Sequence, residues 1–164
     1  IPIFCDTTSC THTLLFETGG DILTPENREK YKQLKIMDIT QWLKEVVLPR
    51  IKVIRPKNRI LLHPTCSCQI MGLTPVLLDI ARKCAREVIL PDNWGCCGAS
   101  GDRGFIFPEL SDSATRDERD EIGHESFDGC YLARTCEIAM QDHIEQPYES
   151  IVYLVDETIQ DQGT

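Results

Sequence analysis

The fold is decided by residues 59–91, which read RILLHPTCSCQIMGLTPVLLDIARKCAREVILP. The apolar run Arg59–His63 predicts a buried strand, and Glu87–Pro91 predicts a second one. Between them, Thr74-Pro75 places a capping hydroxyl and a proline at the start of a helix whose apolar face includes Cys84. This succession of strand, helix and strand predicts an α/β fold with a mainly parallel sheet, and it assigns Cys84 to the core.

Further elements extend this pattern in both directions. Short strands are predicted at Ile3–Cys5 and Asp128–Ala133. Helices are predicted at Asp38–Leu48, with its first residue as the cap, at Pro108–Ile122 and at Tyr148–Ile159. The charged residues from position 116 to position 121, in the helix predicted at Pro108–Ile122, indicate a solvated face. The expected fold is therefore a short, mainly parallel sheet flanked by helices.

The composition limits the classes of partner. A chain of 164 residues with 41% hydrophobic and 26% charged residues can form one ordinary globular core. The net charge of −9 disfavours nucleic acid and anionic membrane surfaces as partners. No apolar run approaches the roughly 18–20 residues that a membrane-spanning helix needs. We expect no membrane span.

A faint internal repeat suggests how the chain is organised. The stretch Thr8–His12 resembles Arg134–Ile138, and each is followed at a distance by an amphipathic helix. We therefore expect residues 1–58 to be the tail of one cysteine-rich repeat with a connecting helix, including a polar loop at 17–35. Residues 59–164 would form a second, whole repeat. Because the chain opens on an apolar strand without Met, we expect it to be part of a longer protein.

Nine cysteines, most of them in pairs, carry the chemistry. Adjacent Cys96 and Cys97 have Cα atoms only ~3.8 Å apart, which is closer than a relaxed disulfide requires. Gly95 and Gly98 flank them and let the backbone approach a ligand. The plain alternative is that they are two small buried apolar residues. The odd count and the pairing favour thiolate ligation in a reducing compartment.

The cysteines also follow the predicted strands. Cys66 and Cys68 come after the first strand of the opening stretch, Cys96 and Cys97 after the second. Cys136 comes after the strand near Ala133, where Thr135 can cap a helix. Since ligands bind outside the carboxyl ends of parallel strands, these thiols should converge on an iron–sulfur cluster or a zinc ion. Zinc is the second choice, because no tight Cys-x-x-Cys knuckle is present.

Two neighbouring features have alternative interpretations. His63 either donates a hydrogen bond to a cluster sulfur from the second shell or is a core or capping histidine. The Gly98–Gly104 loop lacks the lysine and the spacing of a phosphate-binding loop, so we interpret it as the turn that wraps the cluster.

The motifs His63-Pro64-Thr65-Cys66, Trp94-Gly95-Cys96-Cys97-Gly98 and Arg134-Thr135-Cys136-Glu137 resemble those of the cysteine-rich CCG domain. That domain occurs in heterodisulfide reductases and in the iron–sulfur component of glycolate oxidase. The longer run Cys96–Phe105 is similar to the C-terminal iron–sulfur part of FAD-linked oxidases of the D-lactate or D-2-hydroxyglutarate dehydrogenase type. The resemblance covers roughly residues 59–160 and implies a Rossmann-like cysteine-rich domain.

The resemblance implies a cluster ligand set of Cys66, Cys96, Cys97 and Cys136. The family's last motif is often Cys-x-x-Cys, but position 139 is Ala, so a fifth ligand would come from Cys68 or Cys130, with Cys68 preferred. The cluster would be of the 4Fe–4S type, cubane or non-cubane. FAD would belong to the parent protein and not to this chain.

The implied function is electron transfer within a cytoplasmic flavin-dependent oxidoreductase, which can be peripheral to the inner face of the membrane. Electrons would come from the flavin-binding portion of the same polypeptide and leave to a quinone, a cytochrome or a redox protein. The chain alone would be inactive toward 2-hydroxy acids. The alternatives are a cluster-based disulfide reductase module and a zinc-stabilised structural or interaction domain.

Overall fold

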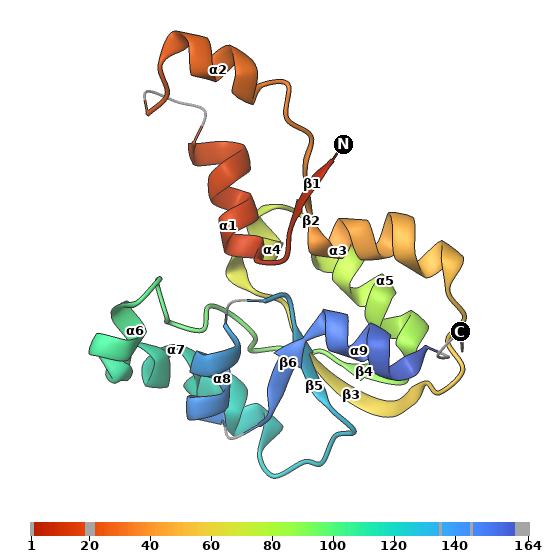
Figure 1. The fold of residues 1–164 in the computed structure, drawn as a ribbon. Helices are drawn as coiled ribbons and strands as arrows, with labels where there is room; N and C mark the ends of the chain where they lie inside the picture. Colours follow the sequence, from red (N-terminus) through yellow and green to blue (C-terminus); the bar gives the residue numbers. More distant parts are fainter. Residues whose placement is uncertain (1, 19–21, 135, 145, 160–164) are drawn as a thin grey trace.

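The computed structural model describes residues 2–18, 22–134, 136–144 and 146–159. Within them lie two parallel sheets, one of two strands in the order β1-β2 and one of four strands in the order β4-β3-β5-β6. Helices pack around both sheets (Figure 1), which confirms the predicted α/β class. The strands are β1 (Ile3–Cys5), β2 (Ile36–Asp38), β3 (Lys57–His63), β4 (Ala85–Ile89), β5 (Cys130–Leu132) and β6 (Tyr148–Ser150).

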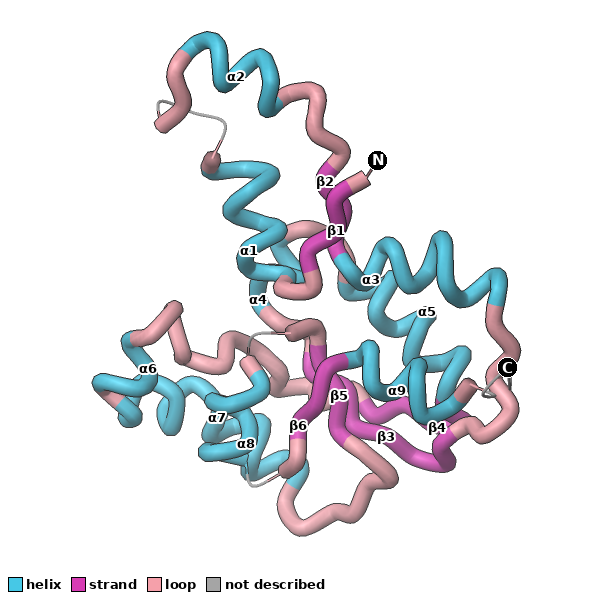
Figure 2. Tube along the Cα trace, in the orientation of Figure 1, coloured by secondary structure: helices cyan, strands magenta, loops and turns pink. Residues whose placement is uncertain are grey.

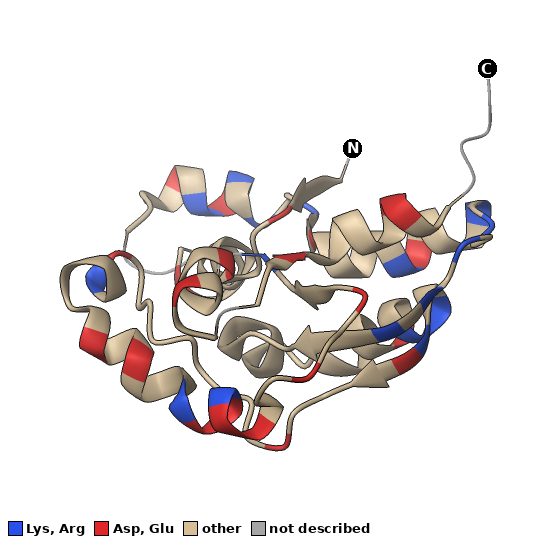
Figure 3. Ribbon diagram, turned by 90° about the horizontal axis from the view of Figure 1, so that it is seen from below, with Lys and Arg blue, Asp and Glu red and all other residues tan. Residues whose placement is uncertain are grey.

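The described helices vary in length from a single turn to four turns. They are α1 (Thr8–His12), α2 (Pro25–Tyr31), α3 (Ile39–Trp42), α4 (Cys66–Ile70), α5 (Thr74–Cys84), α6 (Arg103–Ile106), α7 (Pro108–Ile122), α8 (Glu137–Ile144) and α9 (Ile151–Thr158). A wider π-helical turn, Thr13–Glu17, prolongs α1, and Leu43–Val47 prolongs α3 up to a 3₁₀ turn at Leu48–Arg50. None of the described helices is long and apolar enough to cross a membrane. Figure 3 shows Asp and Glu interspersed with Lys and Arg along the ribbon.

The central strand β3 divides the core into two layers because its side chains alternate between the faces. Ile60 and Leu62 are fully buried on the face covered by α3, α5 and α9, where Cys84 also lies, as predicted. Leu61 is buried on the opposite face, against α7 and α8. His63 follows Leu61 by two residues and therefore points to the α7 side. This alternation places one imidazole at the carboxyl end of the central strand.

Several predicted boundaries differ from the structure. The second predicted strand lies two residues earlier, at Ala85–Ile89, and the loop expected at 17–35 contains helix α2. The helix predicted from Tyr148 is wrong at its start: Tyr148 pairs with Cys130 in the parallel ladder, and Ser150 caps α9 by accepting from Val152 N at 3.3 Å. Asp38 is the cap of α3, as predicted, and accepts from Thr40 N at 2.9 Å.

The same order of elements occurs twice. In each case a strand, a helix, a parallel neighbouring strand and a second helix follow one another: β1, α1, β2, α3 and then β5, α8, β6, α9, with α2 added in the first. In both cases the last residue of the second strand, Asp38 or Ser150, caps the next helix. An ion pair of 3.0 Å between Asp6 and Arg134 joins the two loops that follow β1 and β5. The predicted division at residue 58 stays a prediction.

Candidate metal centre

Four cysteines meet where three neighbouring strands end. Cys66 is the first residue of α4, directly after β3, and Cys136 directly precedes α8, after β5. Cys96 and Cys97 lie in the long loop between β4 and α6 (Figure 2). Because the strand order is β4-β3-β5, the loops after these strands share one edge of the sheet. Thr135, the predicted cap, lies outside the described residues; Cys136 itself accepts from Met140 N at 2.9 Å through its carbonyl.

The sulfur atoms contact one another in a chain. Cys97 Sγ lies 2.7 Å from Cys136 Sγ, and both residues are buried. Cys96 lies close enough to Cys66 and Cys97 for their thiols to lower its pKa. It accepts a hydrogen bond from Gly98 N at 3.4 Å. All four cysteines are free in this structure.

These contacts concentrate negative charge on one sulfur. The thiols of Cys66 and Cys97 lower the pKa of Cys96 to about 2, and the Gly98 amide adds to the effect. The pKa of Cys66 is raised because its thiol donates to Cys96 and is partly buried. The pKa of Cys97 is raised by its contacts with Cys136 and Cys96 and by burial. The contacts therefore favour a thiolate at Cys96 over one at Cys66 or Cys97.

Two glycines hold the cysteine loop against α7. Gly98 has φ +74°, and a Cβ there would lie 2.6 Å from Leu110 O and 2.7 Å from Ser111 Cα. A Cβ at Gly104 would lie 2.7 Å from Ser111 Oγ. Gly95 has open space around its Cα, so close packing does not require glycine there. The loop thus rests directly on the backbone of α7.

A buried histidine–carboxylate pair lies beside the cysteines. His63 Nδ1 is 2.8 Å from Glu118 Oε2 and 3.0 Å from Oε1, and Tyr148 Oη donates to Glu118 Oε1 at 3.1 Å. His63, Glu118 and Tyr148 are each no more than 1% exposed. Burial and the charge of Glu118 raise the pKa of Tyr148, which keeps its hydroxyl a donor. His63 Nε2 is buried without a hydrogen-bond partner among the described residues.

Sequence reasoning missed Glu118 because it interpreted positions 116–121 as a solvated face, which is wrong for this residue. Every residue on one side of α7, namely Ser111, Thr115, Glu118 and Ile122, is buried. Their spacing of four, three and four residues is helical and was visible in the sequence. Glu121 is also engaged, since it accepts from the amides of Asp92 and Asn93 at 2.7 and 2.8 Å.

The other cysteines that the sequence singled out lie elsewhere. Cys68 is fully buried in the core layer of α5, where burial and the nearby Asp38 raise its pKa to about 12. Cys130 faces the opposite core layer, and burial raises its pKa to about 12. Cys130 shares its core cluster with Cys97 and Cys136, but no described hydrogen bond joins its thiol to them. Cys68, the preferred fifth ligand, lies in the other core layer, so the structure does not bring it to the four converging cysteines.

The donor set has the ligand chemistry of an iron–sulfur cluster. Four thiols, one of them a thiolate, are the ligand chemistry that clusters use, and orphaned buried atoms at His63 Nε2 and Ser111 Oγ lie close to their loop. Among the described residues, no group of three or more His, Cys, Asp or Glu has the arrangement to hold one metal ion.

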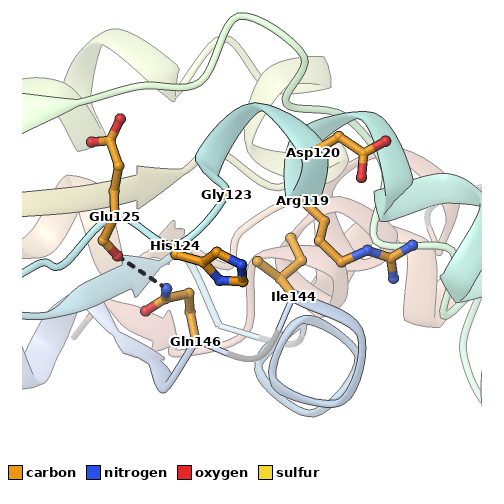
Figure 4. Close-up of a pocket in the computed structure, with 7 residues that line it drawn as sticks. All are labelled: Arg119, Asp120, Gly123, His124, Glu125, Ile144 and Gln146. Atoms are coloured by element: carbon orange, nitrogen blue, oxygen red, sulfur yellow. Dashed lines mark hydrogen bonds between the residues drawn. The ribbon is translucent and has the colours of Figure 1, made fainter.

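A separate pocket of about 610 Å³ opens at the amino-terminal side of the large sheet (Figure 4). It is lined by Arg119, Asp120, Gly123, His124, Glu125, Ile144 and Gln146. Gln146 lies just before β6 and donates to Glu125 O at 3.5 Å. Because all strands of this sheet are parallel, the pocket is at the opposite edge from the cysteines, and it does not belong to their site.

Comparison with known proteins adds no further constraint. No protein-family model matches the chain, and a search of curated proteins finds no match. The likeness to the CCG domain therefore depends on the motifs themselves and on the convergence of their cysteines.

Proposed function

We propose that this chain is an iron–sulfur electron-transfer module, with Cys66, Cys96, Cys97 and Cys136 holding a cluster of the 4Fe–4S type. The observation that supports the proposal is the convergence of these sulfurs, which come from the loops after three adjacent strands. Each of them lies close to at least one other. They are distant along the chain, so packing of neighbouring residues does not account for their meeting.

The protein's own residues supply a prepared ligand set. Cys96 offers a thiolate at neutral pH because the thiols of Cys66 and Cys97 and the Gly98 amide lower its pKa. Burial of Cys97 and Cys136 keeps water from their sulfurs. A cluster bound there would supply one-electron transfer, with a potential tuned by hydrogen bonds and burial.

The motif resemblance supports a place for the module in an FAD-linked 2-hydroxy acid dehydrogenase of the D-lactate or D-2-hydroxyglutarate type. Its electron donor would be the flavin-binding portion of the same polypeptide, and its acceptor a quinone, a cytochrome or a redox protein. A cytoplasmic location, free or peripheral to the inner membrane face, fits that role. The chain alone should oxidise no 2-hydroxy acid even with added FAD.

The test is metal and sulfide analysis with a visible spectrum on protein purified without oxygen. Iron together with acid-labile sulfide, and a broad absorbance that bleaches on reduction, is the expected result. Zinc without colour would contradict the proposal and favour the structural or interaction domain. Flavin-dependent turnover by this chain would contradict the assignment as an electron-transfer module.

A second candidate is disulfide reduction at the same cysteines, favoured by the 2.7 Å contact between Cys97 and Cys136. One sulfur of this pair, once deprotonated, would attack the substrate disulfide, form a mixed disulfide and release the first product thiol. The second sulfur would then displace the other product thiol as the internal disulfide forms. A chemical electron donor would then restore the two thiols. Turnover of a small disulfide with such a donor would favour this candidate, and its absence would leave electron transfer.

A further inference from the structure

The cysteine site contains one buried polar atom that the four thiols leave unexplained. His63 Nε2 is buried and has no hydrogen-bond partner among the described residues. The imidazole lies near enough to Cys96 for the two groups to interact electrostatically. A buried, unsatisfied nitrogen is costly, so a purely structural histidine should have found a partner for it.

The contacts of the other nitrogen determine what Nε2 can do. A carboxylate only accepts hydrogen bonds, so His63 Nδ1 must donate to Glu118. In the neutral ring this leaves the lone pair on Nε2. The Cys97 thiol donates to Cys136, and no described thiol donates to that lone pair. An imidazole that donates from one nitrogen to a buried carboxylate is the usual arrangement of a metal-bound histidine.

We propose that His63 is a nitrogen ligand of the metal centre, bound through Nε2, and that Glu118 and Tyr148 are its positioning residues. This inference depends on the proposed cluster. The fifth donor to the cluster is then His63 Nε2, on the α7 face of the sheet, where it has no hydrogen-bond partner among the described residues. Cys68, in the α5 core layer, is not the fifth donor.

Glu118 and Tyr148 fix the ring from its far side. Tyr148 donates to the same carboxylate that holds His63, and its ring packs edge-on against the imidazole with centroids 6.1 Å apart. The pair therefore selects the tautomer and restricts rotation of the ring. A negative carboxylate also makes the imidazole a stronger donor to a metal.

The decisive measurement is pulsed EPR on the iron-loaded chain with ¹⁵N-labelled histidine. A cluster that passes single electrons has an odd electron count in one of its two states, so one state is always paramagnetic. The wild-type protein should show a strong nitrogen coupling, typical of a directly bound imidazole, that changes with the label. His63→Cys should keep the iron, lose this coupling and lower the reduction potential, because thiolate replaces nitrogen.

The control and the positioning variant sharpen this test. His124→Gln, in the pocket at the opposite edge, should keep the coupling and the potential. Glu118→Gln should keep the coupling but raise the potential, because a neutral amide makes the imidazole a weaker donor. The ligand assignment alone would be overturned if iron-loaded wild-type protein showed no nitrogen coupling. It would also be overturned if the His63→Cys variant kept that coupling. An unchanged potential in Glu118→Gln would overturn the positioning role. Wild-type protein without iron and sulfide would overturn the proposed function itself.

Discussion

Glu118 and His63, 55 positions apart in the chain, form a buried pair in which Glu118 Oε2 lies 2.8 Å from His63 Nδ1. The pair joins the middle of α7 to the carboxyl end of the central strand, next to the loop that carries Cys96 and Cys97. It therefore ties the cysteine site to the helix on which its loop rests.

Removal of Glu118 should destabilise the fold more than any neighbouring charge. Glu118→Ala leaves His63 and the Tyr148 hydroxyl buried without their partner, which costs about 3–5 kcal/mol of the free energy of unfolding. Urea denaturation of the metal-free protein measures this loss. Asp117→Asn on the exposed side of the same helix is the matched control, with a change within about 0.5 kcal/mol. Similar losses in both variants would contradict the pairing.

The fold was predictable because its signals are local, whereas much of the site depends on tertiary contacts. The apolar strand at Arg59–His63 and the cap at Asp38 determine their elements without distant help. Tyr148–Ser150 was misassigned to a helix because its short strand is identified only by pairing with β5. Glu118 was missed because a charged residue is expected in water unless its partner is known, and its partner lies on another element.

The cysteines were found from the sequence for a different reason. Placing thiols directly after parallel strands is a topological argument, and the strand order β4-β3-β5 makes those strand ends neighbours. The rule could not separate Cys66 from Cys68, which are only two residues apart. Cys68 lies inside α4, past its first residue, and its side chain enters the core layer of α5. The core layer into which the Cys68 side chain is buried, and not the sequence spacing, distinguishes Cys68 from Cys66.

Serine substitutions should sort the cysteines into ligands and core residues. Cys97→Ser should lose the iron, because its sulfur contacts both Cys96 and Cys136. Cys68→Ser and Cys84→Ser should keep the iron of the wild type, since both thiols are buried away from the site. Iron and sulfide per chain, measured after anaerobic purification, decide the matter. Loss of iron in Cys68→Ser, with Cys84→Ser unaffected, would restore Cys68 as a ligand.

Cys96 should react as a thiolate in acid. Its pKa is lowered to about 2, so its thiolate persists at all higher pH values in the metal-free protein. An ordinary thiol with a pKa near 8.5 is only about 1 part in 3,000 thiolate at about pH 5. Alkylation of Cys96, followed by peptide mass spectrometry, should therefore slow little between about pH 8 and pH 5. Alkylation of the same cysteine in urea-unfolded protein should slow by roughly 1,000-fold. Equal slowing in the folded protein would contradict the lowered pKa of Cys96.

Alanine substitutions at Gly98 and Gly101 distinguish backbone strain from steric clash in the loop that contains Cys97. Both have positive φ, +74° and +77°, but a Cβ at Gly98 meets Leu110 O at 2.6 Å whereas Gly101 faces open space. Gly101→Ala should cost about 1–2 kcal/mol from the left-handed conformation alone. Gly98→Ala adds a collision with the backbone of α7 and should cost about 1–3 kcal/mol more. Because the collision would push the loop away from α7, it should also weaken iron retention. Urea denaturation and iron content measure the two effects, and equal results for both variants would mean that the loop does not rest on α7.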